Sequence, residues 1–123
     1  MTATVYSSLK MFHHPDTMHA LAAGQHVAPL HVRIKPTNVC NHGCYFCAYR
    51  RTDLSLGSSM QVRDRIPREK MREIVADLIA MDVKAVTFSG GGEPLLYPYL
   101  GETLDRLADA GIKIGVLTNG SQL

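Results

Sequence analysis

Apolar residues form three short runs, and between these runs they recur at the spacing of a helix. The short runs predict strands at about 30–35, 84–88 and 113–117. The helical spacing predicts one helix from about 67 to 81 and another from about 98 to 110. The order is therefore strand, helix, strand, helix, strand, which is typical of parallel strands joined by right-handed crossovers.

The side chains of the first predicted strand alternate between two faces. Val32 and Ile34 point one way, and His31, Arg33 and Lys35 point the other. We therefore expect Arg33 and Lys35 to line either a polar inner face of the sheet or solvent.

Both predicted helices carry an apolar face and a recognisable boundary residue. Pro67 stands where a helix prefers its first residue, and Gly111 is a typical C-terminal stop. The apolar face of the first helix comprises Met71, Ile74, Val75 and Leu78, and that of the second comprises Leu100, Leu104, Leu107 and Ala108.

Two regions are expected, a lead-in over residues 1–29 and one α/β domain over residues 30–123. Within the lead-in, Asp16 or Thr17 is expected to cap a short helix that Gly24 ends.

The composition is that of an ordinary globular protein, with 46% hydrophobic and 20% charged residues among 123. A net charge of +2 is too small to predict binding to nucleic acid or to a membrane surface. No apolar run approaches the roughly 20 residues that span a membrane, and residues 1–12 lack the apolar region of a signal peptide. We therefore expect a cytoplasmic protein.

Each predicted strand is followed by a loop that carries chemically capable residues. The loops are Cys40–Cys47, Ser89–Pro94 and Thr118–Gly120. Because ligands of parallel sheets bind beyond the carboxyl ends of the strands, all three loops are expected at one rim. Thr118 and Asn119 carry the weakest signal, since a turn at a strand end uses such residues anyway.

The chain has three cysteines, and Cys40, Cys44 and Cys47 all lie in the first of these loops. A four-iron cluster is normally held by four cysteine thiolates, so three would leave one iron open to another ligand. An odd number of clustered cysteines also argues against a disulfide framework and for a reducing compartment. Two alternatives stay open: structural zinc completed by His42 or His31, and three small buried apolar side chains.

The loop Ser89-Gly90-Gly91-Gly92-Glu93-Pro94 matches neither common phosphate-binding glycine pattern. An acid directly after the glycines would repel a phosphate but would attract an ammonium group. The loop is therefore predicted to receive an amine at close approach to bare backbone. The alternative is an ordinary turn in which Glu93 is an acid near a helix start.

Two motifs together carry a family resemblance. One is Cys40-x-x-x-Cys44-x-x-Cys47 with aromatic Phe46 before the last cysteine, and the other is Gly91-Gly92-Glu93-Pro94 after the next strand. With Thr37-Asn38-Val39-Cys40-Asn41 and Thr118-Asn119-Gly120, they closely resemble the radical S-adenosylmethionine (radical SAM) superfamily over about residues 30–123. This resemblance implies an α/β fold, a parallel partial (β/α)₆ barrel of which the first three β/α units are present.

The resemblance also implies cofactors and site residues. A 4Fe–4S cluster would be ligated through three of its irons, and the amine and carboxylate of S-adenosylmethionine (SAM) would chelate the fourth. The implied iron ligands, which are also the implied catalytic residues, are Cys40, Cys44 and Cys47. The implied SAM-binding residues are Gly91, Gly92 and Glu93 at the amine, Phe46 near the adenine, and Thr118 and Asn119 bordering the pocket.

The implied reaction is reductive cleavage of SAM to a 5′-deoxyadenosyl radical that takes a hydrogen atom from a substrate. The implied partners are a small-molecule or peptide substrate and an electron donor such as flavodoxin or ferredoxin. The segment before Thr37 and the loop Gly90–Leu96 look most like branches that modify peptides or mature cofactors.

The chain departs from this family in length, because it offers three predicted strands where the family's barrel has six. We therefore expect a missing C-terminal half or a second chain to complete the barrel, since a bare strand edge invites association. The long polar stretch Arg50–Arg65 is expected to be functional. Two other functions stay open: a zinc-stabilised interaction module and a catalytically dead, cofactor-binding fragment.

Overall fold

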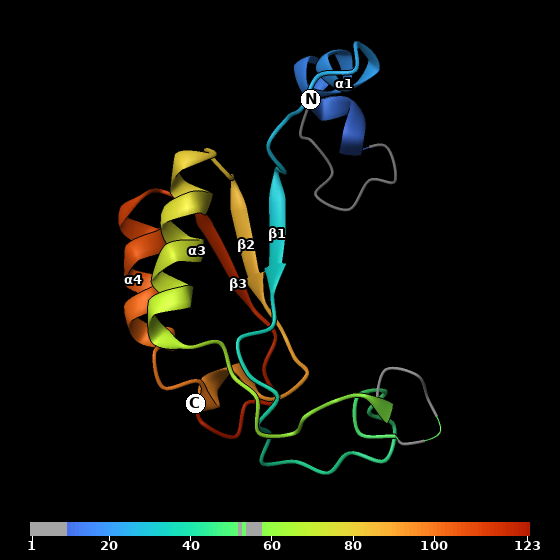
Figure 1. The fold of residues 1–123 in the computed structure, drawn as a ribbon, viewed down its shortest axis with the longest axis vertical. Helices are drawn as coiled ribbons and strands as arrows, with labels where there is room; N and C mark the ends of the chain where they lie inside the picture. The colour runs from blue at the N-terminus through green and yellow to red at the C-terminus, as the bar shows by residue number, and fades with distance from the viewer. Residues whose placement is uncertain (1–9, 52, 54–57) are drawn as a thin grey trace.

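The described part of the chain contains one parallel sheet with two helices packed on one of its faces (Figure 1). The computed structural model describes residues 10–51, 53 and 58–123. The strands are β1 (His31–Ile34), β2 (Ala85–Phe88) and β3 (Lys113–Val116), hydrogen-bonded in the order β1-β2-β3. The helices packed on the sheet are α3 (Arg68–Ala80) and α4 (Leu100–Asp109). The predicted α/β class and parallel topology are confirmed, and the open sheet is consistent with a partial barrel.

The hydrophobic core lies between the sheet and the two helices. Val86 and Phe88 of β2 are completely buried, and Ile34 of β1 lies beside Phe88 in register. Met71, Val75 and Leu78 of α3 and Leu100 and Leu107 of α4 are buried against them. The alternation predicted for the first strand therefore sets which face the helices cover.

The predicted helices are confirmed with shifts of one or two residues at their ends. Pro67 is the N-cap of α3 rather than its first residue. On α4, the prediction for Ala108 was wrong, because Ala108 is exposed and Thr103 is buried in its place. Thr103 tolerates burial because its hydroxyl donates to the Tyr99 carbonyl at 2.7 Å.

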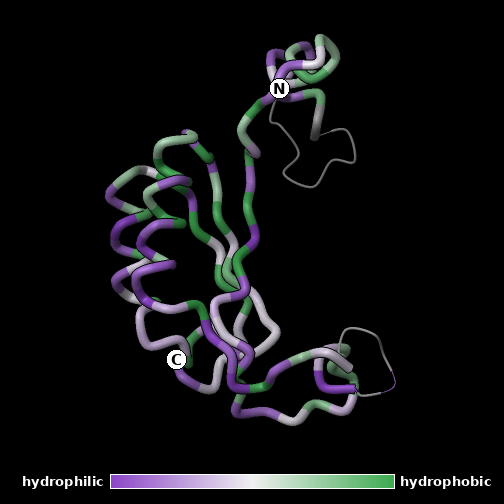
Figure 2. Tube along the Cα trace, viewed as in Figure 1, coloured by the Kyte–Doolittle hydropathy of each residue, from purple (hydrophilic) through white to green (hydrophobic). Residues whose placement is uncertain are grey.

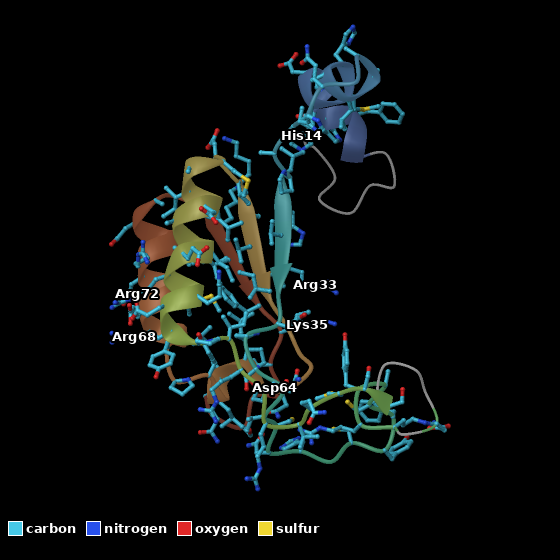
Figure 3. The ribbon with its side chains drawn as sticks, in the orientation of Figure 1. His14, Arg33, Lys35, Asp64, Arg68 and Arg72 are labelled. Atoms are coloured by element: carbon cyan, nitrogen blue, oxygen red, sulfur yellow. The ribbon has the colours of Figure 1, made fainter. Side chains whose placement is uncertain are left out.

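An ion-pair network joins the outer faces of the two helices (Figure 3). Arg68 Nη2 lies 2.8 Å and Arg72 Nε lies 2.5 Å from the Glu102 carboxylate. Both guanidinium groups lower the pKa of Glu102 through hydrogen bonds. The network links the exposed side of α4 to that of α3.

The lead-in contains η1 (Lys10–His13) and α1 (Pro15–Ala22), beyond the amino end of β1 in Figure 1. The predicted cap was wrong: His14 is the N-cap and makes no side-chain cap hydrogen bond, while Asp16 lies in the first turn. Gly24 follows α1 with a φ of +73°, as its predicted role as a stop requires. Residues 1–9, which include most of the segment examined for a signal peptide, lie outside the described residues. In the described residues, helices long and apolar enough to cross a membrane are absent.

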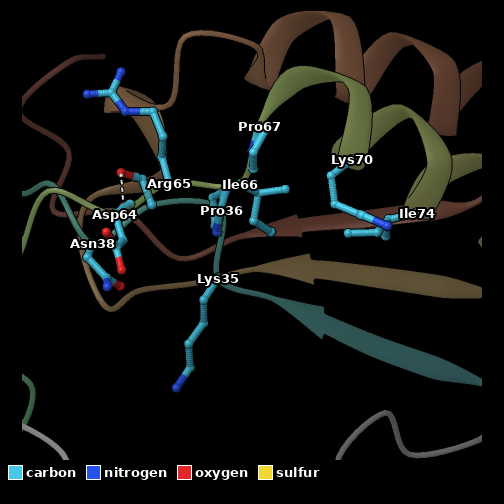
Figure 4. A pocket seen from close by; sticks show the side chains of 10 residues that line it. Lys35, Pro36, Asn38, Asp64, Arg65, Ile66, Pro67, Lys70 and Ile74 are labelled. Atoms are coloured by element: carbon cyan, nitrogen blue, oxygen red, sulfur yellow. Dashed lines mark hydrogen bonds between the residues drawn. The ribbon is translucent and has the colours of Figure 1, made fainter. Parts of the chain in front are cut away.

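The stretch Arg50–Arg65 returns to the chain that follows β1, although residues 52 and 54–57 lie outside the described part. Thr37 and Arg65 form an antiparallel bridge, and Asn38 N–H donates to the Asp64 carbonyl at 2.8 Å. An open hollow of about 330 Å³ lies where this pairing meets α3 (Figure 4). The stretch therefore pairs with, and supports, the segment that leads into the cysteines.

Candidate functional site

Glu93 is the centre of a hydrogen-bonded group at the carboxyl ends of β2 and β3. Its side chain is 2% exposed. One carboxylate oxygen accepts from the Leu95 N–H at 2.9 Å and from the Thr118 hydroxyl at 2.7 Å. The other accepts from the Asn119 N–H at 2.8 Å. A single carboxylate thus ties the loop after β2 to the loop after β3.

The ionisation of Glu93 follows from these contacts. Burial opposes the charged form and taken alone raises the pKa, but hydrogen bonds from Asn119, Leu95 and Thr118 outweigh it. A nearby histidine, His42, adds a smaller effect in the same direction. The pKa of Glu93 is therefore lowered, and the group is a carboxylate at neutral pH.

The glycines before Glu93 are needed for contact with the segment that follows β1. The Gly92 N–H donates to the Thr37 carbonyl at 2.9 Å, and the Glu93 N–H donates to the Val39 carbonyl at 2.8 Å. A Cβ atom on Gly92 would lie 2.1 Å from the Val39 carbonyl oxygen, and one on Gly91 would lie 2.3 Å from Asn38 Oδ1. The sequence suggested that the bare backbone of these glycines would approach an amine ligand. On the side that faces the segment after β1, the glycines contact the protein itself instead.

The cysteine loop is joined to the loop after β3 by side-chain amides. Asn119 Nδ2 donates to Asn41 Oδ1 at 3.0 Å, and Asn41 Nδ2 donates to Ser121 Oγ at 2.7 Å. Ser121 Oγ donates in turn to Asn119 Oδ1 at 2.7 Å. The three loops expected at one rim therefore meet there.

The cysteine thiols suit an iron–sulfur cluster chemically but are not gathered around one point. Cys40, Cys44 and Cys47 are free and half-buried, and a turn in which the Cys47 N–H donates to the Cys44 carbonyl at 3.0 Å brings two of them into one bend. Within the described residues, groups of three or more His, Cys, Asp or Glu side chains placed to hold a metal ion are absent. The donor set fits because three unpaired thiols stand on a loop outside the helices and strands. Their ligation of a cluster, like the zinc alternative, stays a prediction.

The aromatic residues of the cysteine loop face solvent. Phe46 is 70% exposed and packs edge-on against Tyr45, with ring centroids 5.2 Å apart. Further along, the Tyr49 ring lies 4.4 Å from Lys35 Nζ. The structure brings Glu93, Thr118 and Asn119 together but does not join Phe46 to them.

Two residues of this rim were not identified from the sequence. Asn41 links two loops, and Arg50 holds the segment after β1 through a bond from Nη2 to the Asn38 carbonyl at 3.0 Å. Arg50 Nε is buried and has no hydrogen-bond partner in the described part of the chain. The sequence placed Asn41 in the family-like segment Thr37–Asn41 and Arg50 at the start of a polar stretch, but their individual roles depend on partners elsewhere in the sequence.

Curated proteins similar in sequence include an S-adenosylmethionine-dependent nucleotide dehydratase of Flammeovirga pacifica, 30% identical over 106 residues. That match covers 86% of this chain and 35% of the relative. A dTDP-4-amino-4,6-dideoxy-D-glucose ammonia-lyase of Streptomyces venezuelae is 30% identical, with 85% of this chain and 21% of the relative covered. The chain thus spans about a third or less of the length of these relatives.

Solved structures with the same fold include BtrN in complex with AdoMet and 2-DOIA, with a TM-score of 0.62 and 18% identity. The match covers 78% of this chain and 38% of BtrN. Streptococcus suis SuiB bound to precursor peptide SuiA has a TM-score of 0.63 and 19% identity, with 98% of this chain and 26% of SuiB covered.

The Radical SAM superfamily profile matches residues 34–123, which contain all three rim loops, β2, β3 and the last residue of β1. The profile, the sequence relatives and the fold agree with the resemblance that the cysteine and glycine–glutamate motifs carried. On this evidence the chain belongs to the radical SAM superfamily.

Proposed function

We propose that the intact protein is a radical SAM enzyme and that this chain carries the cluster-binding and SAM-binding part of its catalytic domain. When bound, a 4Fe–4S cluster and SAM would supply a 5′-deoxyadenosyl radical that removes a hydrogen atom from a substrate. Cys40, Cys44 and Cys47 would be the iron ligands. The protein residues around this site determine whether the cluster and SAM are held next to each other at the rim.

The observation that carries the proposal is the bonding of three loops around one buried carboxylate. Glu93 holds Thr118 and Asn119, and Asn119 holds Asn41 next to the first cysteine. The three loops come from three parallel strands, and ligands of such sheets bind at that edge. A zinc module would need a fourth ligand near the cysteines, but it would not need this connection.

We further propose that the SAM amine is received at Gly91, Gly92 and Glu93, with Thr118 and Asn119 bordering the pocket and Phe46 near the adenine. A carboxylate offers about four lone-pair positions, and three of those on Glu93 are taken by protein donors. The carboxylate can therefore accept one more donor while still organising the loops. Exposed Phe46 leaves an aromatic face free for stacking.

For the substrate we propose a small molecule rather than a peptide. The relatives at 30% identity are named for a nucleotide and for a dTDP-linked amino sugar. SuiB, bound to a peptide, shares only 19% identity and supports the fold alone. A reducing partner such as flavodoxin or ferredoxin would deliver the electron, and the rest of the barrel would come from a further part of the protein or a second chain.

The test is anaerobic reconstitution of the intact protein with iron and sulfide. We expect a brown protein that holds a cluster of about four irons. The variant Cys44→Ala should lose this cluster. The matched variant His42→Ala removes the histidine of the zinc alternative and should keep the cluster. A colourless protein that binds zinc, and loses it in His42→Ala, would establish the interaction module instead.

SAM cleavage is then measured with a strong reductant. Formation of 5′-deoxyadenosine supports the enzyme. A protein that assembles the cluster and binds SAM but forms no 5′-deoxyadenosine would be the catalytically dead alternative.

A further inference from the structure

The segment that carries the cysteines is closed at its base by the side chain of Arg50. Arg50 Nη2 donates to the Asn38 carbonyl at 3.0 Å, although the two residues are 12 positions apart in the sequence. All three cysteines lie between them. Residues 38–50 contribute nothing to the buried core. Figure 2 shows this segment extending away from the sheet and helices, with hydrophilic and hydrophobic stretches next to each other. Hydrogen bonds rather than apolar packing therefore hold it in shape.

Both ends of this closure are themselves fixed. Asn38 Nδ2 donates to the Gln61 carbonyl at 2.9 Å, and the Asn38 N–H is bonded to Asp64 as described above. The Arg50 N–H donates to the Cys47 carbonyl at 3.0 Å, in the turn that follows the last cysteine. The guanidinium is therefore held at a defined place at the base of the cysteine loop.

The Nε–H group of Arg50 is left without an acceptor. It is buried, and in the part of the chain that the structure describes it has no hydrogen-bond partner. The ion pairs among the described residues do not include Arg50, whereas its neighbour Arg51 pairs with Asp53 at the surface. A buried charged donor without an acceptor is costly and calls for an explanation. Arg50 lacks both an acceptor for Nε and a counter-charge.

The sulfurs of a bound 4Fe–4S cluster and of its cysteine ligands would meet both needs. Thiolate and sulfide sulfurs carry negative charge, and hydrogen bonds to them are among the factors that set the potential of such a cluster. The cysteine loop already directs one donor at sulfur, because the His42 N–H donates to Cys40 Sγ at 3.5 Å. Since Arg50 Nε is buried, an acceptor that belongs to the loop fits it better than a ligand arriving from solvent.

We propose that Arg50 Nε donates to a sulfur of the bound cluster or of its cysteine ligands, and that this contact raises the reduction potential of the cluster. The inference rests on the proposed function, because it concerns the cluster of that same site. The reduced cluster carries more negative charge than the oxidised one, so a guanidinium beside it stabilises the reduced form. Through Nη2 the same side chain also keeps the loop closed.

The first test is a redox titration of the intact protein, reconstituted anaerobically with iron and sulfide and measured without SAM. Electron paramagnetic resonance follows the reduced cluster. We expect Arg50→Gln to lower the equilibrium constant for reduction about tenfold, which is a fall of about 59 mV in the midpoint potential for one electron. An unchanged potential in a fully loaded Arg50→Gln protein would overturn the proposal.

The matched control is Arg51→Gln, which removes the same charge one position along from an exposed side chain that has an acidic partner. Its midpoint potential should equal that of the wild type. Equal shifts in the two variants would mean a general effect of charge on the loop and would overturn the contact. Arg50→Lys keeps the charge but lacks Nε and the planar fork, and it should restore only part of the lost potential. Full restoration would show that charge acts without the hydrogen bond.

Arg50→Gln also removes the bond to Asn38, so a second measurement uses the wild-type protein. Arginine labelled with ¹⁵N at Nε is incorporated, and electron–nuclear double resonance is recorded on the reduced cluster. We expect a ¹⁵N coupling in the wild type and in Arg51→Gln. Its absence from the wild type would contradict the hydrogen bond, as would its persistence in Arg50→Lys.

Cluster assembly and SAM cleavage by the unmodified protein separate this inference from the proposed function. If both occur while the potential does not respond to Arg50→Gln, this inference alone fails. If the unmodified protein assembles no cluster, the proposed function fails and the role of Arg50 fails with it.

Discussion

The helix-covered side of the sheet and the rim at the carboxyl ends of its strands are held together by different forces. The core contains buried apolar side chains such as Phe88 and Leu107, whose contacts have no required direction. The rim contains a buried carboxylate with three donors and glycines in van der Waals contact with backbone. The core is therefore sensitive to lost volume, whereas the rim is sensitive to a single added methyl group or a lost acceptor.

The largest effect on stability should come from removing a buried side chain from the core. Phe88→Ala removes a completely buried ring on the central strand and should lower the free energy of unfolding by about 3–5 kcal/mol. Urea unfolding followed by circular dichroism measures this. The neighbouring Thr87→Ala, on the open face, should cost far less, and equal losses would show that the two faces do not differ as described.

Adding one methyl group should distinguish the rim from a helix surface. Gly92→Ala forces a Cβ against the Val39 carbonyl and should destabilise the protein by up to about 3 kcal/mol. Gly101→Ala adds the same group to α4, where nothing lies within 4 Å, and should stabilise it by about 0.5–1 kcal/mol. Thermal unfolding of the two variants side by side tests the comparison. A neutral Gly92→Ala would mean that the loop contact is not required.

Removing the charge of Glu93 should cost about 1–2 kcal/mol at neutral pH, because charge-assisted hydrogen bonds become neutral or are lost. The folded pKa is lowered, so this stabilisation is present above the ordinary glutamate pKa of about 4.3 and is lost as the pH falls through the folded value. Unfolding measured from pH 7 to pH 3 should show this loss in the wild type and less of it in Glu93→Gln. Parallel pH curves would contradict the assignment.

The smallest effect should come from the exposed amide link. Asn119→Ala removes the bond to Asn41 and should lower stability by about 0.5–1 kcal/mol, because both groups can bond to water instead. It should nevertheless loosen the cysteine loop relative to β3, which faster amide hydrogen exchange at residues 40–47 would report. Unchanged exchange there would show that the link does not hold the loop.

The order and type of the main elements could be predicted because each depends on local spacing. Val32 and Ile34 against Arg33 indicated two faces of a strand, and the apolar face of α3 followed from its helical repeat. The errors lie where contacts with other residues determine the structure. On α4, Thr103 is buried in place of Ala108, and at the start of α1 the N-cap is His14, which precedes the proline.

The candidate site could be predicted only in part. The motifs identified the loops that carry the candidate site residues, and the parallel topology placed these loops at one rim. The internal role of Glu93 could not be predicted, because its partners Thr118 and Asn119 follow 25 and 26 residues later. The Asn41–Asn119 link spans 78 residues and has no local signature.

The sequence by itself determined the family, the alternation of strands and helices, and the spacing of three thiols along one loop, because these are properties of neighbouring residues. Only the tertiary structure decided that the glycines contact the segment after β1 and that Glu93 is saturated largely by its own chain. These features depend on strand register and loop packing, which bring distant residues within hydrogen-bond distance and cannot be read from any single segment.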